Sequence, residues 1–128
     1  MTSISPTFDA RGLAGLLDAC TQDQLDTLGF GVIGFDADTV VRRYNTVESQ
    51  AAGLSPQRVI GEPLFTNVAP CLNNFMVAQR FEDAAADASE LDDTIDYVLT
   101  LRMRPIKVKL RLLASADATM RYVLVQRR

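Results

Sequence analysis

The sequence predicts an α+β domain in which helices flank a five-stranded antiparallel sheet and a helical cap precedes it. One observation is the order of the elements, which runs from short helices through two strands and several helices to three final strands. A second is the alternation of polar and apolar residues in those final strands. With 128 residues, 48% of them hydrophobic, the chain can bury one core but not two. We expect one domain, with residues 1–28 as the cap and 29–128 as the core.

The cap is predicted to contain two short helices between Phe8 and Leu28. Leu13, Leu16 and Leu17 recur at helical spacing, and the segment Thr21–Gln24 has the pattern of a capping box for the second helix. Helices this short are not stable alone in water. They therefore need a docking surface on the rest of the domain.

A β-hairpin and a capped helix are predicted to follow. The segments 32–35 and 39–44 are rich in β-branched and aromatic residues, and Asp36-Ala-Asp38 separates them as a turn. Asn45 is a good N-cap for a helix from Thr46 to about Ala52.

The rest of the core is predicted to contain helices first and strands last. Ser55 followed by Pro56 is typical of a helix start, and an irregular stretch leads from Gly61 to Cys71. The longest helix is expected at 74–88, with one face formed by Phe75, Val77, Ala78, Phe81, Ala84, Ala85 and Ala88. The strands are expected at about 93–103, 106–114 and 119–126. The alternation in 107–112 predicts a sheet with one wet face, and the whole order of elements is typical of a PAS fold.

Charge and composition exclude several classes of function. The formal net charge is −3, which argues against nucleic acid as a partner. There is no apolar run of about 20 residues and no leader-like pattern in residues 1–8, so we expect a cytoplasmic protein without a membrane partner. Cys20 and Cys71 are expected to be free thiols. Because the sequence has no histidine, a Cys-His hydrolase and a histidine-built metal site are excluded, and we expect no enzyme.

Several short motifs are spread along nearly the whole chain: Gln24-Leu-Asp26, Phe30-Gly31, Tyr44-Asn45 with Glu48, Val59-Ile-Gly61, Val68-Ala-Pro-Cys71, and Met103 with Pro105 and Lys107-Val-Lys109. These motifs resemble those of the photoactive yellow protein family, whose members are PAS-type blue-light receptors. The order and spacing of Tyr44, Glu48 and Cys71 make the resemblance specific.

The resemblance implies a p-coumaric acid (4-hydroxycinnamic acid) bound to Cys71 by a thioester. Its phenolate is then buried and hydrogen-bonded by Tyr44 and by a protonated Glu48. Light is expected to drive trans–cis isomerisation, followed by proton transfer from Glu48 and by loosening of the cap, residues 1–28, as the signal. The partner implied is an unidentified downstream signalling protein, and the receptor itself is expected to be a monomer or weak dimer.

The resemblance also predicts which residues surround the chromophore, and it shows where this sequence departs from the family. The additional chromophore-binding residues are Ala52, Leu54, Ile33, Leu64, Val68, Ala69, Pro70, Leu99, Leu101 and Met103. Ala52 and Leu54 stand where the family has a hydroxyl and an arginine, and Leu64, Leu99 and Leu101 replace aromatic residues, while Met103 is retained. We therefore expect an absorption maximum and a recovery rate unlike those of typical members.

Each of the three central residues also has an ordinary structural interpretation. Cys71 is then a buried thiol, Glu48 completes a capping box after Asn45, and Tyr44 is a half-buried strand residue. The alternative function is a non-photoactive PAS module that binds another ligand or a protein.

Overall fold

The computed structural model describes residues 6–100, 104–115 and 119–127. Five strands form one antiparallel sheet in the order β2-β1-β5-β4-β3, so the last strand of the chain lies at the centre of the sheet. The strands are β1 (Gly31–Phe35), β2 (Val41–Tyr44), β3 (Leu91–Leu99), β4 (Ile106–Ala114) and β5 (Arg121–Arg127). The predicted fold class is confirmed.

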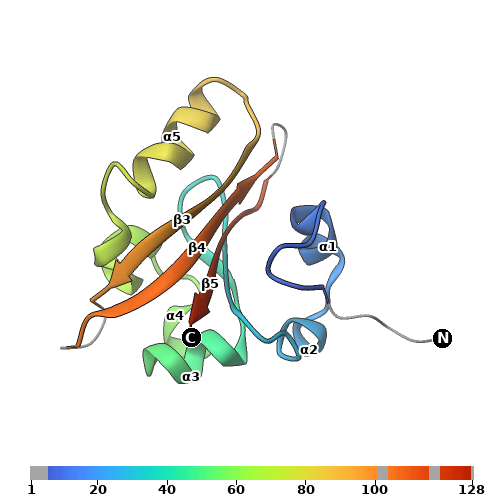
Figure 1. The fold of residues 1–128 in the computed structure, drawn as a ribbon, viewed down its shortest axis with the longest axis vertical. Helices are drawn as coiled ribbons and strands as arrows, with labels where there is room; N and C mark the ends of the chain where they lie inside the picture. The colour runs from blue at the N-terminus through green and yellow to red at the C-terminus, as the bar shows by residue number, and fades with distance from the viewer. Residues whose placement is uncertain (1–5, 101–103, 116–118, 128) are drawn as a thin grey trace.

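The helical segments lie on opposite sides of this sheet (Figure 1). They are α1 (Leu13–Ala19), α2 (Gln22–Leu25), α3 (Thr46–Ala52), α4 (Pro56–Val59), the short turns η1 (Leu64–Val68) and η2 (Pro70–Leu72), and α5 (Ala78–Ala86). The first two helices pack on one face, which we call the cap face. The segments from α3 to α5 cover the other, which we call the helix-covered face.

The alternation along each strand divides the core into two clusters. On β4, Leu112 is buried in the larger cluster on the helix-covered face, whereas its neighbour Leu113 is buried against the cap. The cap supplies Phe8, Leu13 and Leu17 to the smaller cluster. Because side chains alternate in direction along a strand, adjacent leucines pack on opposite faces of the sheet.

Most of the predicted elements are present near their expected positions. The capping box joins Thr21 and Gln24 as expected, and the Asn45 side chain caps α3 by accepting the backbone N–H of Glu48. Ser55 does occupy the N-cap of α4, but among the described residues its side chain makes no capping hydrogen bond. The stretch from Gly61 to Cys71, expected to be irregular, contains the helical turns η1 and η2.

The longest helix is shorter than predicted, because it begins at Ala78 instead of residue 74. The side chain of Asn74 accepts the backbone N–H groups of Met76 and Val77, which forms a turn instead of the first helical turn. Phe75 lies in that turn and is 79% exposed, so the prediction that it belongs to the buried face was wrong. Ala85 and Ala88 are exposed as well.

The expectation of a wet face on β4 holds for Lys107 and Lys109, which are exposed, but it was wrong for Arg111. Arg111 is only 6% exposed, because the cap covers it. Its guanidinium binds both oxygens of Asp92 and donates to the backbone carbonyls of Phe8 and Ala10.

Strand β3 begins two residues earlier than predicted, and the last part of its expected range, 101–103, falls outside the described residues. No helix in the described part of the chain is long and apolar enough to cross a membrane.

Candidate functional site

The junction between β2 and α3 orients two of the predicted site residues. Tyr44 ends β2, Asn45 caps α3 and Glu48 lies in the first turn of that helix. The buried amide of Asn45 accepts the N–H of Val32 at 2.9 Å and that of Glu48 at 3.1 Å. This fixed cap directs the Glu48 side chain back over β1, where it is 1% exposed.

Gly31 provides the space for the Glu48 carboxyl group. A Cβ atom built on Gly31 would lie 2.1 Å from Oε1 of Glu48, which is far inside van der Waals contact. Any other residue at position 31 would therefore displace the carboxyl. The motif Phe30-Gly31 pointed to this position, but the reason for the glycine is visible only in the structure.

Arg127 was not among the predicted site residues, yet it forms an ion pair with Glu48. Its Nη1 and Nη2 donate to Oε1 at 2.8 Å and to Oε2 at 3.1 Å. The last strand was predicted to end at residue 126, whereas β5 includes Arg127. The alternation that places Val123 and Val125 on the helix-covered face extends to residue 127, and this signal was present in the sequence.

Cys71 lies in η2, half-buried against the larger core cluster. The hydroxyl of Tyr97 donates to the carbonyl oxygen of Cys71, and Asn74 Nδ2 donates to the same carbonyl at 3.2 Å and to the Tyr97 hydroxyl at 2.6 Å. These contacts fix the backbone at Cys71 and do not involve its thiol. Tyr97 and Asn74 were also missed by the sequence analysis, because their partners are known only from the fold.

The pKa values of Cys71 and Tyr44 are both raised, and burial is the main cause of each shift. Burial raises the pKa of the Cys71 thiol, with a smaller contribution from the negative charge of Glu48, while the backbone N–H of Thr100 opposes the rise. Burial also raises the pKa of Tyr44, again with a contribution from Glu48, and Arg127 opposes it. Tyr44 and Cys71 pack in or against the larger core cluster and Glu48 lies over Gly31 of β1, so the three groups border the helix-covered face.

The other predicted site residues differ in where they lie. Buried in the larger cluster are Ile33, Leu64, Val68, Ala69 and Leu99. Ala52 is buried at the end of α3, and Leu54 is partly buried against the core. Pro70 is exposed, and it begins η2 directly before Cys71. Leu101 and Met103 lie outside the described residues.

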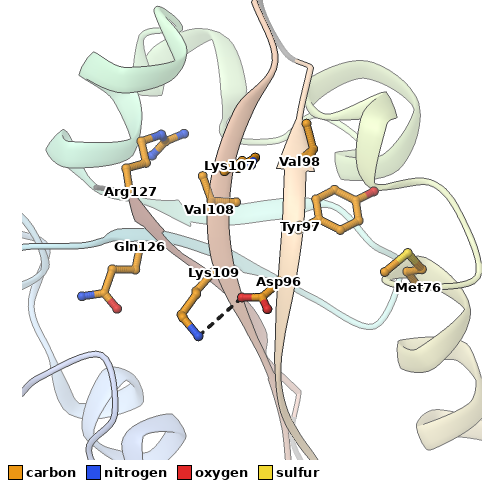
Figure 2. Close-up of a pocket in the computed structure, with 9 residues that line it drawn as sticks. All are labelled: Met76, Asp96, Tyr97, Val98, Lys107, Val108, Lys109, Gln126 and Arg127. Carbon is orange, nitrogen blue, oxygen red and sulfur yellow. Dashed lines mark ion pairs between the residues drawn. The ribbon is translucent and has the colours of Figure 1, made fainter.

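A groove of about 1010 Å³ opens beside this region but is not built from the predicted residues. It is lined by Met76, Asp96, Tyr97, Val98, Lys107, Val108, Lys109, Gln126 and Arg127. Figure 2 shows that Arg127 and Gln126, neighbours on β5, point in opposite directions, and that Lys109 faces Asp96 across the strands, 3.4 Å apart. None of Tyr44, Glu48 and Cys71 lines this groove, so the region at Cys71 is the better candidate for the site.

The chain is similar to known proteins in both sequence and structure. Residues 25–125 match the family model described as the PAS fold, and the architecture is that of a PAS domain. Photoactive yellow protein of Rhodothalassium salexigens is 33% identical over 104 residues, covering 81% of this chain and 82% of the relative. That of Halochromatium salexigens is 32% identical over 105 residues, covering 82% and 83%.

A solved structure gives the same result. The photoactive yellow protein domain of the sensor histidine kinase Ppr from Rhodospirillum centenum superposes with a TM-score of 0.81 at 34% identity, covering 88% of this chain and 98% of that domain. The chain belongs to the photoactive yellow protein family. These relatives are named as photoactive yellow proteins or as a photoactive yellow protein domain of a sensor histidine kinase, which supports a photoreceptor function.

Proposed function

We propose that this protein is a blue-light photoreceptor in which Cys71 carries p-coumaric acid as a thioester. The proposal rests on three groups that lie on the helix-covered face. Tyr44 belongs to the larger core cluster, the half-buried Cys71 packs against it, and the buried Glu48 lies over Gly31 of β1. The protein has no histidine to turn a nucleophilic cysteine into a hydrolase, so an acyl group on Cys71 would stay there.

Attachment needs only an activated acyl donor. The Cys71 thiolate attacks the acyl carbon, the C–S bond forms, and the leaving group departs with the electron pair of the bond that breaks. The thiol packs half-buried against the core cluster, which limits the access of water to the product.

The residues around the thiol fit a planar aromatic acid with an anionic oxygen. Ile33, Leu64 and Leu99 supply apolar surface in the same cluster. Within the described chain, the buried Nε of Arg127 has no hydrogen-bond partner, so the region offers a donor to such an oxygen. Bound p-coumarate would supply visible absorption and light-driven trans–cis isomerisation.

The protein's own part is to hold and move protons at Tyr44 and Glu48. The raised pKa keeps Tyr44 a hydrogen-bond donor at neutral pH. The prediction of a protonated Glu48 in the dark refers to the loaded site, and it stays a prediction. In the structure, both oxygens of Glu48 accept hydrogen bonds from Arg127, which is the arrangement of a carboxylate. Proton donation by Glu48 therefore depends on how strongly Arg127 holds it.

The contacts between the β2–α3 junction and the cap support loosening of the cap as the signal. Gln22 Nε2 donates to the carbonyl of Tyr44 at 3.0 Å, and the N–H of Thr46 donates to Asp26 Oδ1 at 2.8 Å. Asn45 Nδ2 donates to the carbonyls of Leu25 and Phe30. A shift of this junction, caused by a change of charge at Glu48, would strain the contacts that hold α2.

The test is to load the purified chain with p-coumaric anhydride. We expect a mass increase of one acyl group per chain, a visible absorption band that bleaches in blue light, and faster amide hydrogen exchange of residues 6–28 during illumination. Cys71→Ala should abolish the mass increase and the band, whereas the matched control Cys20→Ala should keep both.

Two results would contradict the proposal. One is acylation that survives in Cys71→Ala, and the other is a loaded chain that does not bleach. Either would favour the non-photoactive PAS module. Unchanged exchange in residues 6–28 would contradict the role of the cap alone.

A further inference from the structure

The ion pair between Arg127 and Glu48 is the most buried one found in the described part of the chain. The Glu48 side chain is 1% exposed and that of Arg127 is 18% exposed, whereas the other pairs have at least one partner that is 44% exposed or more. A carboxylate removed from water needs a partner of opposite charge. The two parallel hydrogen bonds from one planar guanidinium supply it and fix the orientation of both groups.

The Nε donor of this guanidinium is not used within the described chain. Arg127 Nε is the single buried side-chain nitrogen or oxygen for which the described chain provides no hydrogen-bond partner. Buried donors without a partner are rare in folded proteins, and each one calls for an explanation. An N–H of a cation that is buried beside Tyr44 and Glu48 is suited to an anionic oxygen atom.

The neighbouring segment supplies no alternative cation. At the end of α3 and directly after it lie Ala52, which is buried, and Leu54, which packs on the core. Within the described chain, the cation that forms an ion pair with Glu48 is Arg127.

We propose that Arg127 sets the charge of the site in two ways: in the unloaded chain it holds Glu48 as a carboxylate, and in the loaded chain it supplies the positive charge beside the anionic oxygen of the ligand. It is a positioning residue toward Glu48 and a binding residue toward the ligand. The second role rests on the proposed function, whereas the first does not.

The first role is tested on the unloaded chain with a double-mutant cycle. Arg127→Gln leaves a buried carboxylate without its partner, and we expect the unfolding equilibrium constant in urea to rise by on the order of 100-fold. Glu48→Gln removes that carboxylate, so Arg127→Gln should change the constant at least about tenfold less in the Glu48→Gln background than in the wild type.

The matched control cycle uses Arg80→Gln and Asp93→Asn, an ion pair whose side chains are 39% and 50% exposed. It should show a coupling below about fivefold. If the effects of Arg127→Gln and Glu48→Gln multiply independently, Arg127 does not hold Glu48, and the first role is wrong.

The second role is tested on the chain loaded with p-coumaric anhydride, in the Glu48→Gln background so that residue 48 stays neutral. We titrate the dark absorption band of the phenolate and read the pH at its midpoint. Arg127→Gln should raise this midpoint by about one pH unit, because a nearby positive charge favours the phenolate, and Arg127→Lys should restore part of the shift.

The outcomes separate the two proposals. A wild-type chain that never acquires the band refutes the proposed function and the second role, while the urea cycle still decides the first. A loaded chain whose midpoint is the same with Gln, Lys or Arg at position 127 refutes the second role and leaves the proposed function standing.

Discussion

The two faces of the sheet are covered in different ways. The helix-covered face carries the larger apolar cluster, which joins all five strands to the segments from α3 to α5. The cap face carries a smaller apolar cluster that is bordered by polar contacts. Arg43 donates to the carbonyls of Leu17 and Cys20, Arg111 donates to those of Phe8 and Ala10, and Tyr122 donates to Asp18.

Because of this difference, we expect the cap to detach from the sheet more easily than the segments from α3 to α5 do. Water can replace a hydrogen bond to a backbone carbonyl, so the net contribution of each is only about 0.5–1.5 kcal/mol, or about 1.5–3 kcal/mol where the donor is charged. Buried apolar surface has no such replacement. We therefore expect the cap face to open more readily than the rest of the domain.

The difference between the two faces is tested most strongly by truncating the adjacent residues Leu112 and Leu113, which are 0% and 2% exposed on opposite faces. Leu112→Ala leaves a cavity in the larger cluster, and we expect a loss of about 2–5 kcal/mol in the free energy of unfolding, measured in urea. Leu113→Ala should cost less, about 1–2 kcal/mol, because the cap can move to fill the space.

Hydrogen exchange distinguishes the two variants. In Leu113→Ala the amides of residues 6–28 should exchange faster than those of α5, whereas Leu112→Ala should speed exchange in all elements alike. Equal losses of stability together with uniform exchange in both variants would mean that the two faces form a single cooperative unit.

A second prediction concerns the contact between Gly31 and Glu48 on the helix-covered face. Gly31→Ala places a methyl group where Oε1 lies, so the carboxyl must leave Arg127, and we expect a loss of about 1–3 kcal/mol in urea. Gly29→Ala is the matched control, because a Cβ there meets nothing within 4 Å, and it should change stability by less than about 0.5 kcal/mol.

The cause is checked by adding Glu48→Ala to both variants. With the carboxylate removed, the difference between alanine at position 31 and alanine at position 29 should shrink. If it stays the same, the strain at position 31 does not come from Glu48.

The smallest expected effect is on the reactivity of Cys71. Burial raises the pKa of its thiol, so the thiolate appears at a higher pH than in a small thiol, whose pKa is about 8.5. In a Cys20→Ala chain, the rate of alkylation by iodoacetamide should therefore still be rising with pH above that value. Glu48→Gln should move the profile slightly to lower pH, because it removes a negative charge. A profile that coincides with that of the free thiol would show that Cys71 is not desolvated.

Local patterns in the sequence were sufficient for much of the fold. The hairpin, the capping box at Thr21, the Asn45 cap and the alternation on β4 each involve residues a few positions apart, whose side chains or backbone groups meet whatever the rest of the chain does. The longest helix was misplaced at its start, since Asn74 competes for the backbone N–H groups that a helix would otherwise use.

The sequence by itself determined the fold class and the family, because motifs and periodicity record local constraints, and it predicted that Tyr44, Glu48 and Cys71 belong to one site. The tertiary structure alone decided that Arg127 meets Glu48, 79 positions away, that Gly31 makes room for the carboxyl, and that the cap buries Arg111. These contacts depend on which strand lies beside which and on which layer covers each face, and no local pattern specifies that.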